Sequence, residues 1–111
     1  MKYSFSPPRV CVDFNEMVDR DLVLLSATDT VVDSDGAVVG LEVGLTVHLY
    51  MPDVDETGQV DPLVASGRVE RNTARDWSAH VRWCCRIDEG VLRLSKADSS
   101  RYSTTVSRRA I

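Results

Sequence analysis

The stretch from Ala79 to Asp88 constrains the fold more than any other part of this chain, because its apolar and polar residues alternate with a period of two. This period is typical of a half-buried antiparallel strand. The sequence therefore predicts a β protein with one strand whose solvent face is unusually basic. The two faces hold Val81, Trp83, Cys85 and Ile87 on the apolar side, and His80, Arg82, Cys84 and Arg86 on the polar side.

Short strand patterns separated by turn signals fill most of the remaining chain. An Asp-Gly pair at 35–36 favours a tight turn, so residues 31–32 and 37–39 are predicted to form a hairpin. Asn15 can cap one helical turn over residues 15–20. Further strands are predicted at 9–14, 22–25, 43–51, 63–70, 79–88 and 91–94. This pattern predicts an all-β fold: a small antiparallel β-barrel or sandwich of six to seven short strands, with at most one short helical turn.

The residues that these strands turn inward form the predicted core, and Trp83 is its largest member. The predicted core consists of Val10, Val12, Phe14, Leu22, Leu24, Val43, Leu45, Val47, Leu49, Val69, Val81, Trp83, Cys85 and Ile87.

A chain of 111 residues is expected to form one domain, here residues 1–96. Residues 97–111 are rich in Ser and Arg and poor in large apolar side chains, so a poorly ordered and dispensable tail is predicted there. No apolar run approaches the roughly 20 residues that span a bilayer, and the N-terminus lacks the apolar region of a secretory signal. With three cysteines, an odd number, the expected location is the cytoplasm.

The net charge of −4 conceals a strong segregation of charge along the chain. Residues 13–61 hold 12 acidic side chains and a single basic one, Arg20, whereas residues 62–111 hold five acids and ten bases. Either the two halves neutralise each other within one fold, or they form separate acidic and basic surfaces that attract charged partners. The acidic overall balance makes nucleic-acid binding an unfavourable interpretation.

Catalytic and metal-binding motifs are absent from the sequence. It contains no Cys-x-x-Cys, no His-x-x-x-His, no phosphate-binding glycine loop and no Gly-x-Ser-x-Gly element. The acidic loop 53–61 begins with the ligand spacing of a calcium loop, but Val64 stands where the last carboxylate is needed and Pro62 interrupts the segment. We therefore expect no metal, no cofactor and no catalytic activity.

On the predicted polar face, Cys84 lies between Arg82 and Arg86, whose positive charges favour the thiolate form of its side chain. The nearest base on the same predicted face, His80, is four residues away, or roughly 13 Å along a strand, which is too far for direct proton transfer. His48, on another strand, could lie closer.

Two registers are compatible with the predicted hairpin of strands 63–70 and 79–88. In the first, Gly67 faces Trp83 and makes room for the indole ring, while Arg68 faces Arg82 on the outer surface. In the second, Val69 faces Trp83. The second register also places Glu70 opposite Arg82 as an exposed ion pair. The first is favoured because aromatic packing over a strand glycine uses more area than that surface pair. It places like charges directly opposite each other, which destabilises a sheet unless something negative lies between them, and Arg68, Arg82 and Arg86 then form a basic patch around Cys84.

Two functions remain open from the sequence. The first is a cytoplasmic interaction or accessory module that binds another protein through a sheet edge or the acidic loop face. The second is a small anion or nucleotide binder that uses the basic sheet face. The residues expected to form this anion site are Arg68, His80, Arg82, Cys84 and Arg86.

Overall fold

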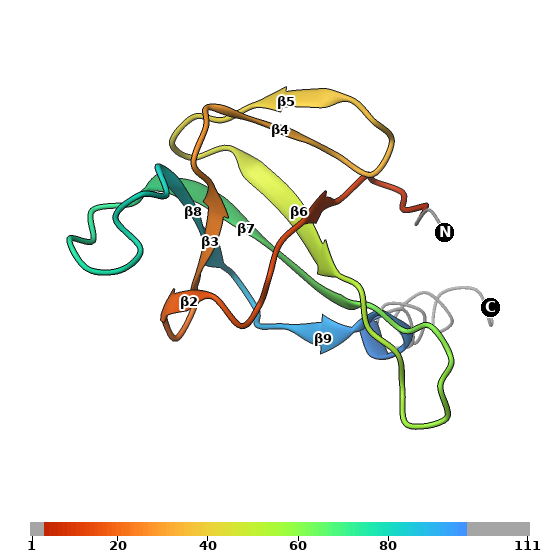
Figure 1. Cartoon of the computed structure of the whole chain (residues 1–111). Coiled ribbons are helices and arrows are strands. Elements are labelled where there is room, and N and C mark those ends of the chain that lie inside the picture. Colours follow the sequence, from red (N-terminus) through yellow and green to blue (C-terminus); the bar gives the residue numbers. More distant parts are fainter. Residues whose placement is uncertain (1–3, 98–111) are drawn as a thin grey trace, which may run out of the picture.

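The computed structural model describes residues 4–97, which form nine β-strands and one helical turn at residues 94–97. The fold class is all-β, as the alternating patterns predict, and the described residues include one short helical turn (Figure 1). The strands are β1 (Val10–Cys11), β2 (Met17–Asp19), β3 (Leu22–Ser26), β4 (Thr30–Val32), β5 (Val38–Gly40), β6 (Thr46–Met51), β7 (Leu63–Arg71), β8 (Trp83–Ile87) and β9 (Leu92–Arg93).

Seven strands form one sheet in the order β1-β6-β7-β8-β3-β2, and β9 also pairs with β7. β1 runs parallel to β6, whereas the other neighbours are antiparallel. The long connection between β1 and β6 allows this parallel pairing, which the sequence pattern did not predict. Among residues 4–97, β1 and β2 stand at opposite ends of the order, so the sheet formed by these residues is not closed (Figure 1). An open sheet or a sandwich therefore fits better than a barrel.

The predicted hairpin is confirmed as a separate two-stranded sheet of β4 and β5, in which Val31 faces Val39. Gly36 takes the positive φ of 86° that the turn requires, and the Asp33 carboxylate accepts a hydrogen bond from the amide of Ala37. Val31 packs against the main core, so the hairpin lies against the larger sheet, near β6 (Figure 1).

The buried residues form two clusters on opposite faces of the sheet. The main one is centred on Leu49, Val23 and Val69, which are fully buried, and the smaller one consists of Leu24, Val81 and Cys84. Ten predicted core residues are buried, and Phe14, Leu22 and Leu45 are partly buried. The ten are Val10, Val12, Leu24, Val47, Leu49, Val69, Val81, Trp83, Cys85 and Ile87.

Val43 is an exception, because 65% of its surface is exposed. The alternating pattern over 43–51 predicts a strand from its first residue, but β6 starts only at Thr46. Gly44 has a φ of 90°, and the amide of Leu45 donates to the carbonyl of Glu42. The chain is therefore still in a turn at Val43, and the prediction of a buried side chain there is wrong.

The predicted helical turn at 15–20 is also wrong. Residues 17–19 form β2, which pairs with β3 and places Met17 opposite Val23. Val18 packs against the smaller cluster. Pairing with a buried neighbouring strand outweighs the weak helix signal of one capping residue, because local propensity is readily overridden by tertiary packing.

The strand predicted over 79–88 is shorter than its alternating pattern, since β8 starts at Trp83. Before it, the carboxylate of Asp76 accepts hydrogen bonds from the amide and hydroxyl of buried Ser78, and Asn72 donates to the carbonyl of Val81. These bonds hold residues 76–81 in turns. Val81 consequently leaves the face of Trp83 and joins the smaller cluster.

Cys84, predicted to face solvent, is completely buried. It does point away from Cys85, as adjacent residues of a strand must, but it enters the smaller cluster under Leu24 and the partly buried Val18 and Leu22. β8 is a central strand, and both of its faces are covered at this point.

Both predicted registers of β7 and β8 are wrong. Trp83 faces Arg71, and Arg68 faces Arg86 rather than Arg82. Gly67 is required for a different reason from the one expected: a Cβ atom there would collide with the backbone carbonyl of Arg86 on the neighbouring strand. Gly67 therefore allows the backbone of Arg86 to approach closely, and the indole ring of Trp83 does not pack over this glycine.

The predicted tail, residues 97–111, lies outside the described residues except for Ala97, which is part of the helical turn. Within residues 4–97, no helix is long and apolar enough to cross a membrane.

Candidate functional site

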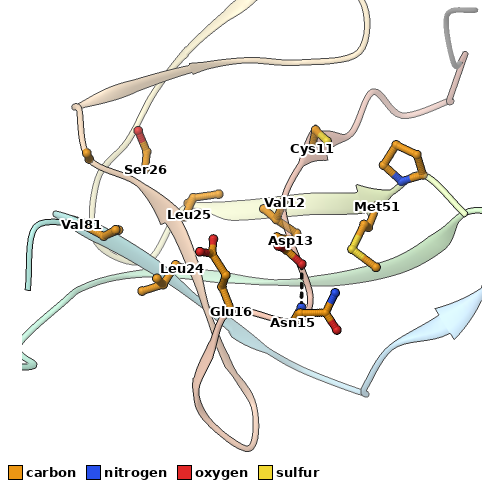
Figure 2. Close-up of a pocket in the computed structure, with 12 residues that line it drawn as sticks. Cys11, Val12, Asp13, Asn15, Glu16, Leu24, Leu25, Ser26, Met51 and Val81 are labelled. Carbon is orange, nitrogen blue, oxygen red and sulfur yellow. Dashed lines mark hydrogen bonds between the residues drawn. The ribbon is translucent and has the colours of Figure 1, made fainter. Parts of the chain in front are cut away.

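An open groove of about 730 Å³ lies between β1 and β3 (Figure 2). Its walls come from four segments: β1 with the turn after it, the second half of β3, the end of β6, and the loop before β8. The lining residues are Cys11, Val12, Asp13, Asn15, Glu16, Leu24, Leu25, Ser26, Ala27, Met51, Pro52 and Val81.

Two strand edges border the groove. β3 pairs with β2 only through Leu22 and Val23, and the amide of Leu24 then donates to the carbonyl of Glu16. Beyond Leu24, the edge of β3 away from β8 has no strand partner among residues 4–97. β1 pairs with β6 on one side, and on its other side the described residues provide only an isolated bridge between Val10 and Asp33. Such edges are templates for an added strand.

The floor of the groove is apolar. Val12, Leu24 and Val81 are buried beneath it, and Leu25 and Met51 are partly exposed to it. Val12 belongs to the main core and Leu24 and Val81 to the smaller cluster, so the floor crosses the boundary between the two. An apolar side chain bound here would contact the apolar surface of both clusters.

Two exposed carboxylates, Asp13 and Glu16, stand over this floor, between the β3 residues and the end of β6 (Figure 2). Asp13 accepts a hydrogen bond of 2.9 Å from the amide of Asn15, but neither carboxylate takes part in an ion pair with a described residue. None of the described lining residues is basic. Uncompensated negative charge beside an apolar floor favours a ligand that combines positive charge with apolar groups.

The exposed thiol of Cys11 lies at the same site, whereas the other two cysteines are buried. Burial raises the pKa of the Cys84 thiol, with a further contribution from Glu70, and raises that of Cys85 to about 12. A thiol protonated at neutral pH is a poor nucleophile. Cys11 is therefore the thiol among the described residues that solvent reagents can reach.

The basic residues predicted to bind an anion do not form one open basic patch, because Arg82 and Arg86 are bonded to carboxylates of the protein. Arg82 donates two hydrogen bonds of 2.9 Å to the carboxylate of Asp29, which also accepts one of 2.9 Å from the indole nitrogen of Trp83. The indole hydrogen bond, followed by that of Arg82, lowers the pKa of Asp29. Arg71 lies over the Trp83 ring at 4.8 Å, so these residues form one structural cluster.

Arg86 is held even more closely. Its guanidinium donates two hydrogen bonds of 3.1 Å to Glu70 and one of 2.6 Å to Asp21, with Asp19 at 3.7 Å. The bonds to Glu70 and Asp21 raise the pKa of Arg86. The charge of Arg86 is thus balanced by acidic residues that lie on β2, on β7 and just before β3.

The remaining predicted anion-site residues do not join these two arginines. Cys84 is buried, and His80 is exposed in the loop before β8, with its Nδ1 atom 3.2 Å from the carbonyl oxygen of Trp77. Arg68 is exposed and makes no ion pair with a described residue. Of the five residues, Arg68 alone presents an uncompensated charge on the sheet face.

A second, smaller cavity of about 390 Å³ contains His48 and Ser66, which are directly opposed on β6 and β7. The Nδ1 atom of His48 lies 2.7 Å from the hydroxyl oxygen of Ser66. Burial, followed by the nearby charge of Arg9, lowers the pKa of His48. The ring is therefore neutral at pH 7, and it bonds to Ser66 across the strands rather than to a cysteine.

Three carboxylates of the acidic loop 53–61 form contacts within the protein. Asp55 accepts hydrogen bonds from Thr57, buried Asp61 accepts two from Ser95, and Asp53 pairs with Arg93 at 3.2 Å. In the part of the chain that the structure describes, no group of three His, Cys, Asp or Glu residues is placed to hold a metal ion.

Comparison of the chain with protein-family models, with curated proteins and with solved structures finds no match.

Sequence reasoning placed Asp13 and Glu16 in an acidic half of the chain but did not identify them as a site. The strand pattern puts Cys11 and Asp13 on the polar face of residues 9–14, which is a usable signal. What it could not show is that β3 leaves an open groove next to this face, because the two segments meet only through the tertiary fold.

Proposed function

We propose that this protein is a small cytoplasmic interaction module, without catalytic activity or a cofactor, that takes an extended segment of a partner protein into the groove between β1 and β3. One observation carries the proposal: Asp13 and Glu16 stand over an apolar floor with no ion-pair partner among the described residues. The free thiols of the three cysteines support a reducing location.

The chemistry of the groove indicates the chemistry of the partner. Side chains of an extended segment point alternately to opposite sides. A segment with apolar residues at every second position can direct them to the floor formed by Leu24, Leu25 and Val12. Lysines or arginines between them have long, flexible stems and can reach the carboxylates of Asp13 and Glu16. Pairing with the bordering strand edges would add backbone hydrogen bonds.

A titration of the ¹⁵N-labelled protein tests this function. The probe is a short capped peptide in which lysine and valine alternate, compared with its glutamate–valine counterpart. The lysine peptide is expected to shift the amide signals of residues 11–16 and 24–26, and the glutamate peptide is expected to leave them unchanged. Shifts confined to other regions, or equal shifts with both peptides, would contradict the proposal.

A matched pair of variants isolates the two carboxylates. Asp13→Asn with Glu16→Gln is expected to weaken binding of the lysine peptide about tenfold, which corresponds to about 1.4 kcal/mol. Glu42→Gln with Glu56→Gln makes the same change in net charge at two exposed residues outside the groove and is expected to leave the affinity within about twofold of the original. Equal weakening in both variants would mean that only the overall charge matters.

The anion or nucleotide binder is less well supported by the contacts. Arg82 and Arg86 would have to give up their carboxylate partners, and Cys84 is buried. Phosphate and adenosine nucleotide titrations serve as the test: shifts of the Arg68, Arg82 and Arg86 signals would favour this alternative over the groove.

A further inference from the structure

Residues 98–111 carry positive side chains, which the lining of the groove lacks. They include Arg101, Arg108 and Arg109 against a single acid, Asp98. We infer that this segment of the same chain occupies the groove between β1 and β3 and competes there with the partner segment. The competition rests on the proposed function, whereas the contact itself does not.

The described structure ends close enough to the groove for this contact. Met51, at the end of the groove, faces Leu63 on β7, and Leu63 faces Arg93 on β9. Two strand spacings, or about 10 Å, therefore separate Met51 from Arg93. The four residues of the helical turn, Leu94 to Ala97, add about 6 Å. Fourteen further residues can extend up to about 46 Å, so the segment can reach both Asp13 and Glu16.

Charge complementarity selects this segment as the occupant. The groove has an excess of two negative charges, at Asp13 and Glu16, and residues 98–111 have an excess of two positive ones. Tyr102, Val106 and Ile111 provide apolar side chains that match the floor. Because the segment is tethered to the protein, its effective concentration at the groove is in the millimolar range, so weak contacts suffice.

The protein contains its own reporter for groove occupancy. Cys11 is exposed at the groove, while Cys84 and Cys85 are buried and their pKa values are raised. A nitroxide reagent therefore labels Cys11 of the native full chain selectively. Its unpaired electron broadens the signals of backbone amides that come near the groove.

The contact is tested on the ¹⁵N-labelled full chain with the nitroxide on Cys11, at low ionic strength. Broadening of the amides of residues 101–109 is expected. It should decrease strongly with Asp13→Asn and Glu16→Gln, decrease with added salt, and persist with Glu42→Gln and Glu56→Gln. A mixture of nitroxide-bearing chain without ¹⁵N and unmodified ¹⁵N chain should show no broadening, because the contact is within one chain. Absence of broadening in the first sample, or equal loss with both pairs of variants, overturns the inference.

The competition is tested by binding of the lysine–valine peptide to full-length variants. Replacing Arg101, Arg108 and Arg109 with serine is expected to increase the affinity about tenfold, as follows if the segment fills the groove about nine-tenths of the time. The matched control replaces Arg20, Arg68 and Arg75 with serine, since these are exposed and make no ion pair among residues 4–97. Its net charge is the same, and its affinity should stay close to that of the original chain.

The outcomes separate the inference from the proposed function. Equal peptide affinity in the original chain and in the variant at residues 101, 108 and 109 would overturn the competition and leave the proposed function standing. No peptide binding to either chain, together with nitroxide broadening of residues 101–109, would overturn the proposed function and leave the intramolecular contact standing.

Discussion

The groove and the β7–β8 face, which here means Arg82, Arg86 and their carboxylate partners, both gather charged residues, but the two regions balance their charges differently. On the β7–β8 face, Arg82 and Arg86 are bonded to Asp29, Glu70 and Asp21. At the groove, the carboxylates of Asp13 and Glu16 have no ion-pair partner among the described residues. The segregation of charge along the chain thus resolves into local neutralisation at one region and an uncompensated surface at the other. Residual charge, rather than the density of charged residues, identifies the candidate site.

The largest expected effect tests whether the β7–β8 region is structural. Trp83 is 4% exposed, packs in the main core and donates to Asp29. Trp83→Ala is expected to lower the free energy of unfolding by about 3–5 kcal/mol through lost burial and a cavity. Trp77→Ala, at a residue that is 60% exposed, is the control and should change it by less than about 0.5 kcal/mol. Both follow from urea unfolding, and an unchanged midpoint for Trp83→Ala would contradict the structural interpretation.

A smaller effect is expected from the partners of Arg86. Glu70→Gln combined with Asp21→Asn removes its two closest carboxylates and should destabilise the protein by about 1 kcal/mol, because the residues are partly exposed and solvent screens the attraction. Urea unfolding at low and high salt provides the measurement. The loss should shrink at high salt, and a gain in stability would mean that the ion pairs do not hold β7, β8 and β3 together.

The contribution of Asp29 should depend on pH in a defined direction. Hydrogen bonds from Trp83 and Arg82 lower its pKa in the folded protein below the ordinary value of 3.8. The stabilisation is therefore fully present above pH 3.8 and is lost as the pH falls through the lower folded value. Asp29→Asn is expected to lower the melting temperature at pH 7, and its difference from the original protein should shrink below pH 3.8. A difference that is constant down to the lowest pH would exclude this charge effect.

The smallest effect on stability is expected at the groove. Asp13→Asn with Glu16→Gln should change the free energy of unfolding by no more than about 0.5 kcal/mol, since neither carboxylate is ion-paired with a described residue. In this variant the amide oxygen of the new side chain at position 13 can still accept the hydrogen bond from the backbone of Asn15. The same variant is expected to weaken peptide binding. A loss of stability comparable to that of the Glu70 and Asp21 variant would remove the contrast between the two regions.

Local patterns predicted the elements that depend on local chemistry. The hairpin of residues 31–39 follows from its Asp-Gly turn, and the burial of Trp83 and Cys85 follows from alternation. The helical turn at 15–20 was wrong because one capping residue carries little information against pairing with β3. The exposure of Cys84 was wrong because a pattern of alternation shows which residues share a face and not whether that face is covered.

The candidate site was less predictable than the fold. Arg82 and Arg86 share a polar pattern in the sequence, yet their partners lie up to 65 positions away along the chain, as between Arg86 and Asp21. The groove likewise joins residues 11–16 to residues 24–27 and to Met51 and Val81. No spacing rule connects such segments. The sequence therefore showed that residues 13–61 are acidic, but it did not show the groove.

By itself, the sequence determined the all-β class, the hairpin, the inward faces of the main strands and the separation of acidic from basic residues. These depend on the period of two along a strand and on turn chemistry, which act over a few residues. Only the tertiary structure decided the register of β7 and β8, the open sheet, the carboxylate partners of the arginines and the groove between β1 and β3. Shifting a strand by two residues keeps its faces unchanged, so side-chain alternation cannot select among such registers. In the observed register, Gly67 admits the close approach of the Arg86 backbone, and both faces of β8 are packed.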